Sequence, residues 1–186
     1  MIRNLVLSIV LLLSGAGCAS HSVSEVFLPL ETMYEKPIGI GSSITTLHNT
    51  VWVNDIDDYL KRKPEGSPLY NGDMLHERIH SIRMGGIFGT MWFVAKYVFD
   101  DDFMREEEFI GWYFELLYLK TKGIVRSPYY TANFLMGYEN LGGPMFDTKE
   151  EALQWVLDVY SGKWKPNISE KEWAFYYTDI VKALND

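Results

Sequence analysis

The residues best suited to chemistry lie in one five-residue segment, His76-Glu77-Arg78-Ile79-His80, which matches the pattern H-E-x-x-H. Residues four apart on a helix share one face, so the two imidazoles of this segment can bind one metal ion. Glu77 follows the first histidine directly, where its carboxylate can take a proton from water that the metal activates. The spacing therefore predicts a site for one zinc ion (Zn2+), with Glu77 as general base.

A zinc site of this kind needs a third protein ligand, and carboxylates follow the motif on the next predicted helix. Glu106, Glu107 and Glu108 open that helix, and Glu115 lies further along it. Gly111 comes three residues after Glu108, and a residue without a side chain lets two helices approach closely. We expect Glu108 to be the third ligand, while the sequence leaves Glu107 as the alternative. The alternative is that these glutamates bind no metal and simply form an acidic first turn, which the helix dipole favours.

With these residues, the chain resembles the gluzincin group of zinc metallopeptidases. Members of that group carry His-Glu-x-x-His on one helix and a ligand glutamate on the next. The resemblance covers roughly residues 44–120, and it implies a small zincin-like domain that cleaves peptide bonds. It also implies His76, His80 and Glu108 as the zinc ligands and Glu77 as the catalytic base.

The first residues have the features of an export signal. Arg3 supplies positive charge, residues 5–13 are apolar apart from one serine, and Ala16-Gly17-Cys18 follows. The apolar stretch is about half of the ~20 residues that a membrane-spanning helix needs. Residues 1–17 thus resemble a bacterial lipoprotein signal peptide, with lipid attached to Cys18, the chain's single cysteine. Because Ala19 and Ser20 are not aspartate, the resemblance implies the outer membrane, facing the periplasm.

The elements that must position the motif are mostly helical. Residues 18–40 read as a tether and lead-in, and 41–186 as a single zincin-like domain. Val, Thr and Trp predict a strand from Ile44 to Asn54, and Pro and Gly predict a loop from Lys61 to Asp73. Helices are expected from an N-cap at Asp73 through the motif to Phe99, with a bend at Gly85, Gly86 and Gly89, and over residues 105–120, 148–160 and 169–184. The expected fold class is α+β, predominantly helical, with an upstream strand or small sheet packed on the motif helix.

Other residues offer alternatives to this assignment. Arg83 shares a helix face with His76 and can bind a carboxylate, although a structural role is favoured. Three tyrosines could donate to an oxyanion, but 15% aromatic content makes packing the simpler explanation for each. His48 is favoured as a surface or packed residue. The three tyrosines are Tyr129, Tyr130 and Tyr138.

Composition narrows the function classes. The 186 residues carry a formal net charge of −8, which disfavours a nucleic-acid partner. A single cysteine excludes an internal disulfide. Two partners are expected. One is a peptide or protein substrate in the cell envelope, and the other is the membrane, which the lipid on Cys18 would contact. The alternative is a non-catalytic envelope lipoprotein that binds a partner or serves as a structural module, descended from a peptidase.

Overall fold

The computed structural model describes residues 20–23, 30–36, 44–137, 139–140 and 143–181. Helices dominate, and the strands form a small four-stranded sheet and a separate two-stranded hairpin, so the fold class is α+β and predominantly helical, as predicted. The predicted signal peptide and the lipid-attachment residue Cys18 lie outside the described residues.

The sheet has four short strands in the order β1-β2-β4-β3. β2 and β4 are parallel, and the two outer pairs are antiparallel. The edge strand β3 packs against the helix that carries the H-E-x-x-H motif. The strands are β1 (Ser20–Ser22), β2 (Thr32–Glu35), β3 (Ile44–Leu47) and β4 (Thr50–Val53).

Two predictions about this region were wrong. The segment 18–40, expected as a tether and lead-in, contributes β1 and β2 to the sheet, and Met33 of β2 is fully buried. Strands of three or four residues show almost no local periodicity, and β2 is fixed by pairing with distant β4. The expected single strand from Ile44 to Asn54 is a hairpin that turns at His48, whose φ of 55° ends the extended conformation.

The helices follow the sheet along the chain. The predicted helices at 105–120, 148–160 and 169–184 correspond to α5, α7 and α8 with its π-helical continuation η2, as far as residue 181. A capping box opens α8, since Ser169 and Glu172 each bond the other's backbone N–H. The helices are α2 (Ile56–Arg62), α3 (Pro68–Met84), α4 (Ile87–Phe99), α5 (Asp101–Thr121), α6 (Pro128–Met136), α7 (Lys149–Ser161), α8 (Glu170–Ala174) and η2 (Phe175–Val181), with a short hairpin of β5 (Glu139–Asn140) and β6 (Gly143–Pro144).

The motif helix α3 begins six residues earlier than predicted. Ser67 caps it and Pro68 occupies its first turn, a position that suits proline because that N–H has no partner within a helix. Asp73 is therefore not an N-cap: it lies buried in the helix, where its carboxylate accepts hydrogen bonds from Tyr59 and Lys63. The predicted bend is a break, since α3 ends at Gly85, whose φ of 66° suits glycine, and α4 starts at Ile87.

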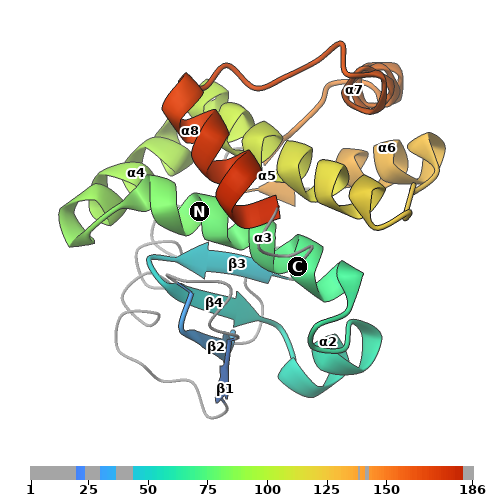
Figure 1. Cartoon of the computed structure of the whole chain (residues 1–186). Coiled ribbons are helices and arrows are strands. Elements are labelled where there is room, and N and C mark those ends of the chain that lie inside the picture. Colours follow the sequence, from blue (N-terminus) through green and yellow to red (C-terminus); the bar gives the residue numbers. More distant parts are fainter. Residues whose placement is uncertain (1–19, 24–29, 37–43, 138, 141–142, 182–186) are drawn as a thin grey trace.

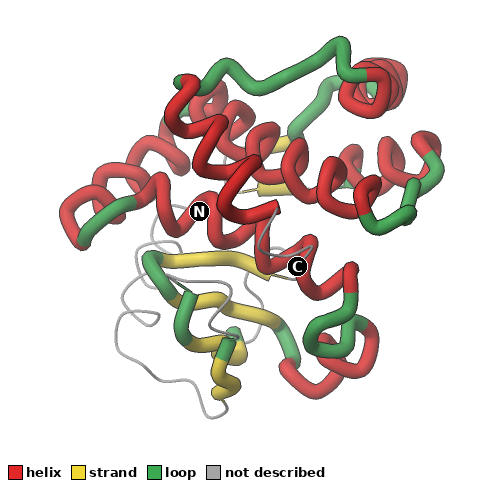
Figure 2. Tube along the Cα trace, in the orientation of Figure 1, coloured by secondary structure: helices red, strands yellow, loops and turns green. Residues whose placement is uncertain are grey.

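The helix α3 lies between the four-stranded sheet and the later helices (Figure 1), and a hydrophobic core fills each side. Tyr70 and Met74 pack on the sheet side, whereas Leu75 and Ile79 pack into a larger core built by the later helices. Figure 2 shows this division, with the four-stranded sheet on one side of α3 and the long helices on the other. The motif consequently lies in the interior of the molecule rather than on a solvated helix face.

Candidate metal centre

Three predicted ligands converge in the structure. His76 and His80 lie one turn apart on α3, and Glu108 reaches them from α5, the helix that packs most extensively on α3. One ligand atom from each residue lies within 4.8 Å of the other two. Nε2 of His76 is 3.4 Å from Oε2 of Glu108, and Nε2 of His80 is 3.5 Å from Oε1. The side chains named from the sequence thus form one buried group.

The spacing of these atoms fits a divalent metal ion. Ligands at about 2.0–2.1 Å from a tetrahedral zinc ion lie about 3.3–3.4 Å from one another. The distances from the two histidines to Glu108, 3.4 and 3.5 Å, are of this size, although each runs to a different carboxylate oxygen. Among the described residues, both Nε2 atoms and Oε2 of Glu108 are buried without a hydrogen-bond partner. Buried polar atoms are normally satisfied, and a shared cation would satisfy all three. Two imidazoles and one carboxylate also form a donor set that zinc accepts.

The close approach of α5 depends on Gly111. A Cβ at this position would lie 2.7 Å from Nε2 of His76 and under 3 Å from two ring carbons. Real Cβ atoms do not come so close, so any side chain would displace the imidazole. The predicted role of this glycine, to let the second helix bring Glu108 to the histidines, is confirmed.

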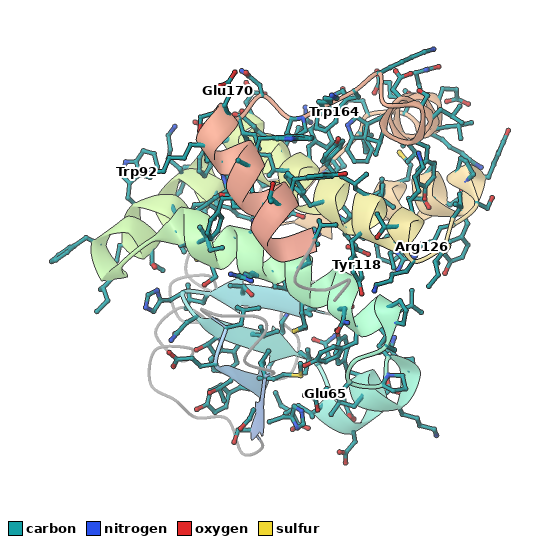
Figure 3. The ribbon with its side chains drawn as sticks, viewed as in Figure 1. Glu65, Trp92, Tyr118, Arg126, Trp164 and Glu170 are labelled. Atoms are coloured by element: carbon teal, nitrogen blue, oxygen red, sulfur yellow. The ribbon has the colours of Figure 1, made fainter. Side chains whose placement is uncertain are left out.

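Glu115 and Arg126 support His76 from its other ring nitrogen. Oε2 of Glu115 lies 3.4 Å from Nδ1 of His76, and Nη1 of Arg126 donates to Oε1 of Glu115 at 3.2 Å. A carboxylate on the far nitrogen of a metal-binding histidine fixes the tautomer and orients the ring. Arg126, labelled in Figure 3, comes from the segment between α5 and α6.

Aromatic side chains enclose the three ligands. The indole of Trp112 stands edge-on to His76, with ring centroids 5.2 Å apart, and Phe93 of α4 stands 6.4 Å from His80. Tyr97, one turn further along α4, donates its hydroxyl to Oε1 of Glu108. The sequence analysis missed these three residues. Nothing in the local pattern of Phe93 and Tyr97 indicates that α4 folds back over α3 and α5, and nothing in that of Trp112 distinguishes it from a core residue of α5.

The ligand group has a distinct charge pattern. Burial lowers the pKa of His76, but Glu108 and Glu115 outweigh burial and hold that pKa well above its ordinary value. Burial lowers the pKa of His80 to about 4, which keeps this imidazole neutral. Burial would raise the pKa of Glu108, yet the two histidines and Tyr97 hold it at about 2. The centre therefore contains one carboxylate, one neutral imidazole and one imidazole that must lose a proton to bind a metal.

Glu77 lies between this group and the sheet. Burial and the charge of Glu108 raise its pKa to about 7, while His76, Thr46 of β3 and Lys36 at the end of β2 partly oppose the rise. The pKa of Lys36 is itself lowered to about 8 by burial, against the attraction of Glu77. A carboxylate with a pKa near neutrality is suited to accept and return a proton.

The remaining candidate residues, Arg83, Glu107 and His48, have partners outside the group of three ligands. Arg83 makes a two-pronged ion pair with Glu107, with N–O distances of 2.6 and 2.7 Å, so Glu107 is engaged away from the ligand group. Arg83 also donates to Glu172 of α8 at 2.6 Å, which gives it a structural role. His48 bonds the carbonyl of Gly85.

The tyrosines considered as hydrogen-bond donors to an oxyanion are not among the residues found around the three ligands. Tyr129 and Tyr130 lie on the exposed side of α6. Tyr138 lies outside the described residues.

No family model matches the chain, and no curated protein or solved structure shows significant similarity to it. Within the part of the chain that the structure describes, no helix combines the length and apolar composition needed to cross a bilayer.

Proposed function

We propose that this protein is a zinc-dependent hydrolase, a metallopeptidase of the gluzincin type. The observation that carries the proposal is the convergence of His76, His80 and Glu108 within 4.8 Å, next to the buried carboxylate of Glu77. Two histidines and one carboxylate leave a fourth tetrahedral position for water or substrate, as in catalytic zinc sites.

The proposed chemistry assigns each residue a task. His76, His80 and Glu108 hold the ion, and Glu115 keeps the ring of His76 in place through Nδ1. A bound zinc ion supplies Lewis acidity, which activates water toward attack on a carbonyl. Glu77 accepts the proton from the attacking water and then passes it to the leaving amine.

A peptide substrate is favoured by the position of β3. This strand forms the edge of the sheet and packs against α3, and Thr46 of β3 interacts with Glu77. An extended peptide can add to a sheet edge as a further strand, which would bring its backbone beside the general base. The proposed site of action is the bacterial cell envelope, with the protein anchored through lipid on Cys18 to the outer membrane.

The burial of the ligands favours a second candidate, a structural metal site in a non-catalytic lipoprotein. His76, His80 and Glu108 are only 3–5% exposed. A closed site contributes folding energy when it binds its metal, whereas a catalytic site must admit substrate.

The substitution Glu77→Gln separates the two candidates. The purified chain and the variant are loaded with zinc and incubated with a mixture of peptides of known sequence, and new peptide ends are identified by mass spectrometry. Under the hydrolase proposal, Glu77→Gln keeps its zinc but loses cleavage by at least about a hundredfold, because only the proton acceptor is removed. Zinc-loaded protein that never cleaves, but unfolds at a lower temperature once the metal is removed, supports the structural candidate.

A further inference from the structure

The two carboxylate oxygens of Glu108 have different surroundings. Oε1 accepts a hydrogen bond from the hydroxyl of Tyr97, whereas Oε2 is buried without a hydrogen-bond partner among the described residues. The residue as a whole is only 3% exposed, so solvent does not reach its carboxylate freely. Because buried carboxylate oxygens are normally hydrogen-bonded, the difference between the two oxygens calls for an explanation.

The unsatisfied oxygen belongs to a set of atoms that one ion could satisfy together. Nε2 of His76 and Nε2 of His80 are also buried without a hydrogen-bond partner in the described part of the chain. These two nitrogens and a carboxylate oxygen of Glu108 are the donors of the candidate metal centre. At the carboxylate, the hydroxyl of Tyr97 already engages Oε1, so Oε2 is the oxygen that remains for an ion.

The turn between α4 and α5 sets the position of this hydroxyl. The N–H of Asp100 closes the last turn of α4, and its carboxylate accepts a hydrogen bond from the N–H of Phe103 at 3.0 Å. Because one residue ends α4 and caps α5, Tyr97 in the last turn of α4 comes beside Glu108 in the second turn of α5. The phenol stacks on the buried ring of Phe93, with centroids 5.8 Å apart, which holds it on the side of the ligands.

We propose that Tyr97 is a positioning residue of the metal centre, whose hydroxyl occupies Oε1 so that Glu108 binds the ion through Oε2 alone. This inference rests on the proposed function and concerns how that site would stay open. Carboxylates bind metal ions through one oxygen or through both. With one oxygen and two imidazoles, a four-coordinate zinc ion keeps a position for water or substrate. Binding through both oxygens would fill that position and give the closed coordination of a structural site.

The substitution Tyr97→Phe removes the hydroxyl and keeps the aromatic ring. Phenylalanine can still stack on Phe93, so α4 retains its apolar contact beside the ligands. Without the hydrogen bond, Oε1 is a second unsatisfied oxygen on the same buried carboxylate, and we expect it to bind the ion as well. The expected result is a change from one carboxylate oxygen to two, with both histidines retained as ligands.

Cobalt(II) reports this change, because it accepts the ligands of zinc and absorbs visible light more strongly with four ligands than with five or six. The full wild-type chain and Tyr97→Phe are freed of metal by a chelator and loaded with an equimolar amount of Co2+. Circular dichroism checks that both retain their helices. We expect the intense bands of a four-coordinate ion in the wild type, and the loss of most of that intensity in Tyr97→Phe.

The matched control is Val94→Ala, at a half-buried position on the same helix. This variant trims the packing of α4 but leaves the hydroxyl in place, so we expect the wild-type cobalt spectrum even if it unfolds at a lower temperature. An equal change of the spectrum in both variants would overturn the proposal, because it would reduce Tyr97 to a packing residue.

Three further outcomes would overturn the proposal. They are equally intense spectra of wild type and Tyr97→Phe, a weak spectrum of the wild type, and a folded Tyr97→Phe that holds no cobalt although three ligands remain. Each of these leaves the binding of metal by the wild type, and so the proposed function, standing. A wild type that binds neither cobalt nor zinc would instead overturn the metal centre and the proposed function together with this inference.

Discussion

Gly111 of α5 lies directly against the imidazole of His76 on α3, so closely that a Cβ would stand 2.7 Å from Nε2. The ring nitrogen of His76 that is a candidate metal ligand therefore has its position only because the facing helix carries no side chain at this point. It also explains how Glu108, one turn earlier on α5, comes within reach of both histidines.

The first prediction concerns Gly111→Ala. The added methyl group must push the ring of His76 aside, and we expect zinc affinity to fall by about tenfold or more. The free energy of unfolding should change by less than about 2 kcal/mol, because alanine's better helix propensity partly offsets the overpacking. Competition titration against a chromophoric chelator measures the affinity. Gly137→Ala, where a Cβ would make only ordinary contacts at 3.6 Å, is the control, and equal affinities for the two variants would contradict the account.

A second prediction concerns the support of His76 by Glu115. The substitution Glu115→Gln keeps the size of the side chain but removes the charge beside Nδ1 and the ion pair with Arg126. Loss of such a partner typically costs about 10–100-fold in metal affinity, and we expect a value in that range. The same chelator competition gives the number, with Glu151→Gln on the exposed start of α7 as control. An unchanged affinity would show that Glu115 does not orient the ring.

The third prediction follows from the pKa of Glu172. Burial would raise this pKa, but Ser169 and Arg83 lower it below the ordinary 4.5. A carboxyl whose pKa is lower in the folded state stabilises the fold above 4.5, and this stability is lost as the pH falls through the folded-state pKa. The contribution is small because the side chain is 39% exposed.

Thermal unfolding between neutral pH and about pH 3 checks this, with Glu172→Gln as the comparison. We expect the wild type to be the more stable at neutral pH, and the gap between the two proteins to close as the pH falls. A gap that stays constant, or widens in acid, would rule out the ion pair with Arg83 as its source.

Much of the candidate metal centre could be predicted from sequence because the relevant residue spacings lie within single helices. The i, i+4 spacing of His76 and His80 and the Glu108–Gly111 spacing on one helix each express the geometry of a single helix. The Ser169–Glu172 capping box, at the start of the helix predicted over residues 169–184, is equally local. Features of this kind need no knowledge of what packs against them.

The features that were predicted wrongly or missed depend on contacts between distant segments. β2 is a strand because it pairs with β4, some 18 residues later, and its own four residues carry no clear pattern. Asp73 has the sequence context of an N-cap, yet its bonds to Tyr59 and Lys63 place it inside α3. Tyr97 reaches Glu108 only because the chain reverses at Gly85 and returns α4 across the centre.

The most direct test of the central claim is the zinc content of the purified, zinc-exposed protein beside that of His76→Ala. Elemental analysis after extensive dialysis should find one zinc ion per wild-type chain and almost none in the variant, with circular dichroism confirming that both retain their helices. A wild type without stoichiometric zinc, or a folded variant that binds as much as the wild type, would contradict the assignment of His76, His80 and Glu108 as a metal centre.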